Sequence, residues 1–132
     1  MKRLDTTLSE LTSTAKRPFE DATAMPPGVY TNEAFLAREI ETIFAKEWVC
    51  IGRSSALKEP GDYITYDLAG QPIVVLRDNE RKLKAFSNVC LHRMSTLLEG
   101  QGYTRSIVCR YHAWTFNLDG SVRGAPFMKP TT

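Results

Sequence analysis

Cysteine and histidine are scarce in this chain of 132 residues, which contains three Cys and two His. Three cysteines cannot all pair, so a framework of disulfide bonds is not expected. No apolar run approaches the roughly 20 residues that a membrane-spanning helix needs, and residues 1–21 lack the apolar centre of a secretory signal. The net charge is only +2 and the basic residues are dispersed, so no surface for nucleic acid is indicated. We therefore expect a cytoplasmic protein that binds neither membrane nor nucleic acid.

The N-terminal third of the chain divides at the turn-forming run that ends at Gly28. Residues 1–28 are rich in Ser, Thr and charge, so we expect a poorly ordered or extended arm with at most a short helical turn near residues 8–11. Residues 29–48 have a helical period that predicts one amphipathic helix packed on the domain, with its apolar face in the core. The apolar side chains at this period are Phe35, Leu36, Ile40, Ile43, Phe44 and Trp48.

Residues 49–128 contain short apolar or alternating segments separated by turn residues, a pattern typical of β-strands. The predicted strands are WVCIGR, DYITYDL, QPIVVLR, KLKAFSNV, SIVC, WTFNL and SVRGA. Their near-regular spacing predicts a mainly β fold, an antiparallel sandwich or barrel preceded by the N-terminal helix. Cys50 lies in an apolar strand with no His nearby, so we interpret it as a core residue.

The remaining cysteines each lie close to a histidine, in the patterns Cys90-x-His92 and Cys109-x-x-His112. Thiolate and imidazole are good ligands for soft and borderline metals. Each half follows a predicted strand, so two loops could face each other across one metal centre. Any one of these residues alone could be an ordinary core or surface residue, but the set of four predicts a metal site.

Two kinds of metal centre fit two thiolates and two imidazoles. One is a tetrahedral zinc ion. The other is a [2Fe–2S] cluster in which two Cys bind one iron and two His bind the other. Zinc fingers usually pair Cys with Cys in one half and His with His in the other. Here each half supplies one of each, which favours the iron–sulfur cluster.

The segments CLHR, CRYHAWTF and LDG resemble the alpha subunits of Rieske non-haem iron oxygenases of the aromatic ring-hydroxylating dioxygenase type. The upstream segments KEWVCIGR, PGDY and PIVVLRD follow in the family's order, so the resemblance covers about residues 29–128. It implies a Rieske-type domain over residues 49–128, with a cluster-binding subdomain at about 88–125. Met94 and Ala113 depart from the family, which often has Gly or small residues there.

The resemblance also implies roles for the neighbours of the ligands. Tyr111 and Trp114 would cover the cluster and exclude water, although core packing explains both equally well. Arg93 and Arg110 would face carboxylates of a neighbouring subunit, or else solvent.

The same resemblance implies a reduction potential. Respiratory Rieske proteins have hydroxyl donors beside the second loop, whereas Ala113 follows His112 here. Hydrogen bonds to the sulfurs raise the potential, so we expect a value at the low end of the Rieske range, on the order of −150 to 0 mV.

Oxygenases of this family hold a mononuclear Fe(II) in a second domain, on two His and one carboxylate. His92 and His112 are the only histidines of this chain and the cluster needs both, so we expect the catalytic domain, and every catalytic residue, to be absent from it. The resemblance implies electron transfer within an oxygenase that hydroxylates or demethylates small organic substrates, using O2 and electrons from NAD(P)H.

The expected partners are a reductase or ferredoxin that donates electrons, and neighbouring alpha subunits in a homotrimer or α3β3 assembly. Two alternatives remain open, a stand-alone Rieske-type ferredoxin and a zinc-stabilised structural module. The long N-terminal region and Trp114 argue against the ferredoxin.

Overall fold

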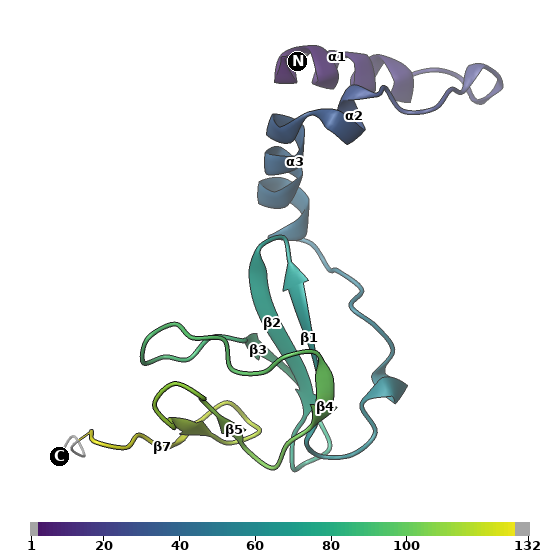
Figure 1. Ribbon diagram of the computed structural model, residues 1–132. Helices are drawn as coiled ribbons and strands as arrows, with labels where there is room; N and C mark the ends of the chain where they lie inside the picture. The colour runs from purple at the N-terminus through teal and green to yellow at the C-terminus, as the bar shows by residue number, and fades with distance from the viewer. Residues whose placement is uncertain (1–2, 129–132) are drawn as a thin grey trace. The chain divides into compact units, whose positions relative to one another are not determined.

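The computed structural model describes residues 3–128, and the chain divides into two compact units, Met1–Val49 and Cys50–Thr132 (Figure 1). The first unit is helical. Its elements are α1 (Leu4–Ala15), the 3-10 turn η1 (Phe19–Asp21), α2 (Gly28–Thr31), α3 (Glu33–Glu39) and the π-helical turn η2 (Ile40–Phe44). Across the described residues no helix is both long enough and apolar enough to cross a bilayer.

Helix α1 lies within the segment predicted as an arm, so the structure has three helical turns where one was expected. Tertiary contacts explain the difference. Thr7 is fully buried and accepts a hydrogen bond of 3.1 Å from the side-chain amide of Asn32. Gly28 lies so close to α1 that a Cβ on it would be 2.7 Å from the Thr7 hydroxyl. A helix held by such long-range contacts has little signal in its own sequence.

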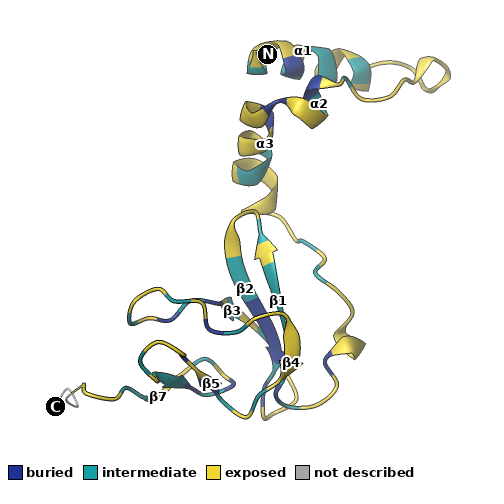
Figure 2. Ribbon diagram, viewed as in Figure 1, coloured by how far each residue is buried: buried dark blue, intermediate teal, exposed yellow. Residues whose placement is uncertain are grey.

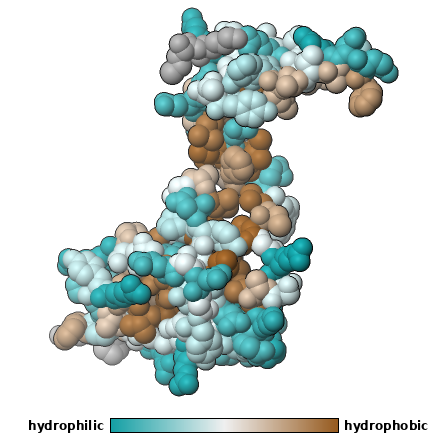
Figure 3. All heavy atoms as spheres, turned by 45° about the vertical axis from the view of Figure 1, so that its right-hand side comes forward, coloured by the Kyte–Doolittle hydropathy of each residue, from teal (hydrophilic) through white to brown (hydrophobic). Residues whose placement is uncertain are grey.

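The single helix predicted for residues 29–48 is broken at Asn32, whose extended backbone separates α2 from α3. The Asn32 side chain caps α3 by accepting hydrogen bonds from the backbone N–H of Ala34 and Phe35. The predicted burial of the apolar stripe is largely wrong, because only Phe35 is buried. Trp48 is fully exposed, and hydrophobic residues reach the surface along α3 and η2 (Figures 2 and 3).

The second unit confirms the antiparallel β architecture. One sheet has the order β3-β2-β1-β4 and the other the order β5-β6-β7. The strands are β1 (Asp62–Leu68), β2 (Gln71–Arg77), β3 (Leu83–Ser87), β4 (Gln101–Tyr103), β5 (Ile107–Val108), β6 (Thr115–Phe116) and β7 (Val122–Gly124).

The β1–β2 hairpin has the predicted bounds, and its register pairs Tyr63 with Leu76 and Leu68 with Gln71. The predicted strand WVCIGR is wrong, because residues 48–53 contain no strand. Cys50 is exposed there, so its interpretation as a core residue is also wrong. Among residues 3–128, no strand pairs with this segment to bury its apolar side chains.

The hydrophobic core of the second unit joins the strands to the Cys-containing loops. Val74 and Leu76 of β2 are fully buried, and Cys90 and Cys109 lie in the core with them. The buried residues of this cluster are Leu76, Cys90, Leu97, Ile107, Cys109, Phe116 and Leu118. The positions of both thiol groups are therefore set by core packing.

The Asn32 side chain should hold the first unit together. Asn32→Ala removes the cap of α3 and the hydrogen bond to Thr7, and should lower the stability of this unit by about 1–2 kcal/mol. Hydrogen exchange of the amides in α1 and α3 measures this. The control is Thr31→Ala, which removes an exposed hydroxyl bonded to the carbonyl of Pro27. If Asn32→Ala and Thr31→Ala increased hydrogen exchange in α1 and α3 equally, the stabilising role of the Asn32 side chain would be contradicted.

Candidate metal centre

The two Cys-containing loops have the same backbone hydrogen bonds. In the first loop the N–H of Cys90 donates to the carbonyl of Ser95 at 2.8 Å, and the N–H of Met94 donates to the carbonyl of Cys90 at 3.0 Å. The second loop repeats this at 2.8 Å from Cys109 to Trp114 and at 2.9 Å from Ala113 back to Cys109. Each cysteine thus begins a tight loop that closes five residues later.

Both loops turn through a left-handed residue four positions after the cysteine. The φ angle is 56° at Met94 and 58° at Ala113. This region favours glycine, because a Cβ approaches the following carbonyl there. Met94 and Ala113, which stand where the family often has Gly or small residues, therefore occupy the two positions whose backbone conformation favours glycine.

The loops bring the two sulfurs together in the core. Cys90 is 1% exposed and Cys109 is 3% exposed, and neither forms a disulfide. Burial raises the pKa of the Cys90 thiol. Burial also acts to raise the pKa of Cys109, but the backbone N–H groups of Tyr111 and His112, with the side chains of Cys90 and Ser95, outweigh it and the pKa is lowered. The surroundings therefore favour negative charge at Cys109 more than at Cys90.

The two imidazoles form a second pair. The ring centroids of His92 and His112 lie 4.8 Å apart with the planes at 71°, and both side chains are half-buried. Burial, with the charges of His92 and Arg93, lowers the pKa of His112, so the neutral form of its ring is favoured. The Nδ1 atom of His112 is buried and has no hydrogen-bond partner in the described part of the chain. A buried nitrogen of this kind normally has a partner, and a metal ion would be a suitable one.

The four side chains fit a two-iron cluster better than a single ion. Within residues 3–128, no three Cys, His, Asp or Glu side chains are grouped as ligands of one metal ion. One pair of sulfurs and one pair of imidazoles instead suit two irons that each take two protein ligands. A tetrahedral zinc would need all four atoms to converge on one point.

Aromatic rings flank the imidazoles on both sides. Trp114 stacks on His92 with centroids 5.1 Å apart and planes at 2°, and Tyr111 lies 3.9 Å from His112 at 42°. Trp114 is half-buried and packs against the core, whereas Tyr111 is exposed. Both predicted neighbours therefore contact an imidazole.

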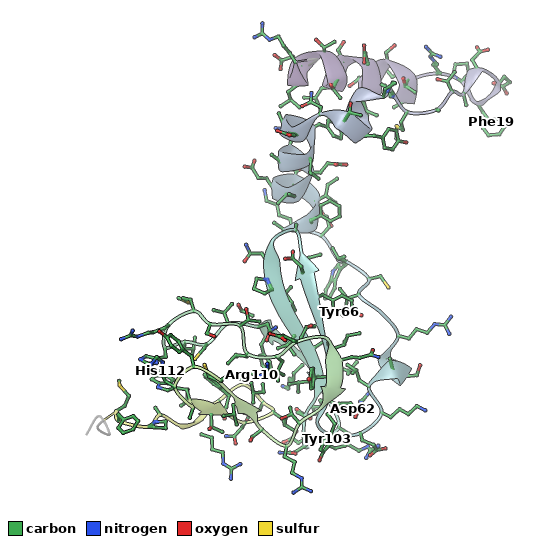
Figure 4. All side chains as sticks on the ribbon, viewed as in Figure 1. Phe19, Asp62, Tyr66, Tyr103, Arg110 and His112 are labelled. Carbon is green, nitrogen blue, oxygen red and sulfur yellow. The ribbon has the colours of Figure 1, made fainter. Side chains whose placement is uncertain are left out.

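The two arginines beside the predicted ligands are exposed. Arg110 lies 3.8 Å from the carboxylate of Glu99, a solvent-exposed pair of little energetic weight (Figure 4). The charge of Arg93 contributes to lowering the pKa of His112.

Ser95 was not predicted to influence the site. Its carbonyl closes the first loop, and its hydroxyl donates to the carbonyl of Thr96 at 3.4 Å. The Ser95 side chain also contributes to lowering the pKa of Cys109 in the second loop. Because this influence passes from one loop to the other, the spacing of residues in the sequence does not reveal it.

The chain is similar to proteins of one known family. Residues 47–132 match the model of the Rieske [2Fe-2S] domain. The carnitine monooxygenase oxygenase subunit of Acinetobacter baumannii is 46% identical over 102 residues, covering 76% of this chain and 28% of that protein. The choline monooxygenase of Spinacia oleracea is 44% identical over 113 residues, covering 86% of this chain and 26% of that protein.

A solved structure of a quaternary ammonium Rieske monooxygenase, described in connection with carnitine oxidation and inter-subunit electron transfer, has a TM-score of 0.73 and 46% identity. It covers 77% of this chain and 28% of that chain. The two loops and these similarities thus indicate an iron–sulfur protein. The chain belongs to the Rieske [2Fe-2S] domain family, and its relatives are Rieske oxygenase subunits. It spans less than a third of the length of the curated relatives it matches.

Removal of the Ser95 hydroxyl should lower the reduction potential of the cluster. The Ser95 hydroxyl favours negative charge at the Cys109 sulfur, and a polar group with this effect stabilises the more negative, reduced state of a cluster. Its loss, worth about 1 kcal/mol, corresponds to about 40 mV for one electron. Protein-film voltammetry of Ser95→Ala measures the change. Thr96→Val removes the adjacent hydroxyl and should leave the potential unchanged, whereas an unchanged potential in Ser95→Ala would contradict this role.

Glycine at the left-handed position of the second loop should stabilise the domain. Ala113→Gly relieves the Cβ contact, partly offset by the entropy of glycine, for a net gain of about 0.5–1 kcal/mol. Ala85→Gly, in the ordinary backbone of β3, should lower stability by about 0.5–1 kcal/mol. Denaturant unfolding of both variants gives the two values. A loss of stability in Ala113→Gly would show that the left-handed turn carries no strain.

Proposed function

We propose that Cys90 and Cys109 bind one iron of a Rieske [2Fe–2S] cluster and that His92 and His112 bind the other. The observation that carries the proposal is the paired arrangement, with two adjacent buried sulfurs and two imidazoles 4.8 Å apart at the ends of matching loops. The Nδ1 atom of His112, which is buried and has no hydrogen-bond partner within residues 3–128, adds support, because it can offer a lone pair to a metal.

The cluster, when bound, accepts and donates one electron at a time, and the chain's own residues prepare its surroundings. The core shields the two sulfurs from water, while the half-buried imidazoles lie nearer the surface. Neutral imidazole in place of thiolate lowers the negative charge of the cluster and raises its potential above that of all-Cys clusters. We infer that electrons enter and leave on the imidazole side, since tunnelling distances are shortest there.

At the level of the whole protein we propose an oxygenase alpha subunit whose Rieske domain is this chain. The curated relatives are carnitine and choline monooxygenases, so a small quaternary ammonium compound is the proposed substrate class. A mononuclear Fe(II) in a domain outside this chain would perform the oxygen chemistry.

The free cysteines of the chain suit a reducing cytosol.

The proposed partners are a reductase or ferredoxin that supplies electrons and neighbouring alpha subunits, as a homotrimer or α3β3 assembly. Inter-subunit electron transfer described for a related monooxygenase supports the second partner. The relatives favour this function over a stand-alone ferredoxin, because those closely matched are oxygenases.

Iron and sulfide assays on the anaerobically prepared chain test the ligand assignment. We expect two irons and two sulfides per chain and, after dithionite reduction, a rhombic EPR signal of the His-ligated type. Cys90→Ser, Cys109→Ser, His92→Ala and His112→Ala should each abolish that signal, because each removes one of only two protein ligands to an iron.

Cys50→Ser is the matched control, since Cys50 is the third cysteine and is exposed. It should retain the full iron content and an unchanged spectrum. A colourless chain that holds one zinc and takes up no cluster from iron and sulfide would contradict the proposed function.

A further inference from the structure

The imidazole of His92 lies in a slot formed by the opposite loop. His92 belongs to the first loop, and its two ring neighbours, His112 and Trp114, both belong to the second. The indole plane is parallel to the His92 ring within 2°, and the His112 ring meets it at 71°. One face of the His92 ring is therefore against an indole, and His112 limits its movement on another side.

The indole of Trp114 is itself fixed. Its backbone carbonyl closes the second loop by accepting the N–H of Cys109 at 2.8 Å. Its side chain is half-buried and packs against the core cluster that includes both cysteines. The indole is thus attached to the same core that positions the sulfurs.

A centroid separation of 5.1 Å with parallel planes is an offset stack. Such stacking fixes the orientation of a ring in addition to burying its surface. A ligating imidazole needs a fixed ring plane, and partners that orient metal-bound His contribute strongly to metal affinity. Among the described residues, the stack with Trp114 is therefore a contact that can orient the His92 ring.

We propose that Trp114 is a positioning residue that holds the His92 imidazole in its iron-binding orientation across the two loops. The inference rests on the proposed ligand set and goes beyond it. It assigns the indole a role that general water exclusion does not require, since any bulky apolar side chain at position 114 would exclude water.

The test compares Trp114→Phe, Trp114→Leu and Trp114→Met in the full chain, reconstituted with iron and sulfide. Pulsed EPR of the reduced protein gives the g-values and the ¹⁴N couplings of the histidine ligands. Trp114→Phe keeps a planar ring and should give a spectrum close to that of the parent. The Leu and Met variants should show a broadened rhombic signal with one of the two nitrogen couplings altered. They should also lose iron to a chelator about tenfold faster, at the lower end of the effect of removing a group that orients a ligand.

Phe86→Leu is the matched control, because Phe86 packs against the same core and has no ring contact with either imidazole among the described residues. Its nitrogen couplings should be unchanged even where its stability falls. Unchanged couplings in both Trp114→Leu and Trp114→Met, or equal changes in Phe86→Leu, would overturn the positioning role while leaving the ligand assignment intact. A parent chain that binds no cluster would overturn the ligand assignment, and this inference with it.

Discussion

The enclosure of two cysteines in one hydrophobic core is the constraint on which the rest of the second unit depends. Cys90 and Cys109 are as deeply buried as the leucines and isoleucines around them. Their loops can reach this position only by turning back immediately, and the N–H and carbonyl of each cysteine are both used in that turn. Because the buried backbone groups are paired within the loop, burial of the sulfur leaves no backbone donor or acceptor of the cysteine unsatisfied. The strands can then close over the loops as an ordinary apolar core.

This arrangement gives the candidate centre two different sides. On the inner side the sulfurs are within the core, and backbone N–H groups with the Ser95 side chain favour negative charge at Cys109. On the outer side the imidazoles are half-buried, with an exposed tyrosine and two exposed arginines near them. A charge added to the centre is therefore stabilised by fixed donors within the protein and, at the imidazoles, by solvent. Such a centre can change its charge with little rearrangement, as electron transfer requires.

The sequence predicted the parts of the structure that have a strong local signal and missed those held by distant contacts. The hairpin of β1 and β2 was predicted to the residue, because an alternating segment and a short apolar segment are joined by the two-residue turn Ala69-Gly70. Strand β4 was missed, because its three residues are all exposed and carry no apolar pattern. Helix α1 depends on Thr7 and Asn32, which are 25 positions apart. For the candidate site, the Cys/His spacing predicted four ligands, and the structure brings these residues together as two pairs. The influence of Ser95 on Cys109 passes between the loops, so no spacing in the sequence predicts it.

The two loops have the same backbone hydrogen bonds but carry their histidines at different offsets from the cysteine. This difference accounts for the different surroundings of the two imidazoles. His92 stands two residues after its cysteine, whereas His112 stands three residues after Cys109. If the offsets were equal, matching loops would present matching rings. The one-residue difference instead brings the rings together at 71°. It also leaves Trp114, which stands five residues after its cysteine as Ser95 does in the first loop, beside the ring of His92. The residue that closes each loop therefore influences a candidate ligand in the opposite loop. The Ser95 side chain favours negative charge at Cys109, and the Trp114 indole stacks on the ring of His92. Each loop thus contributes to the surroundings of a candidate ligand that it does not contain.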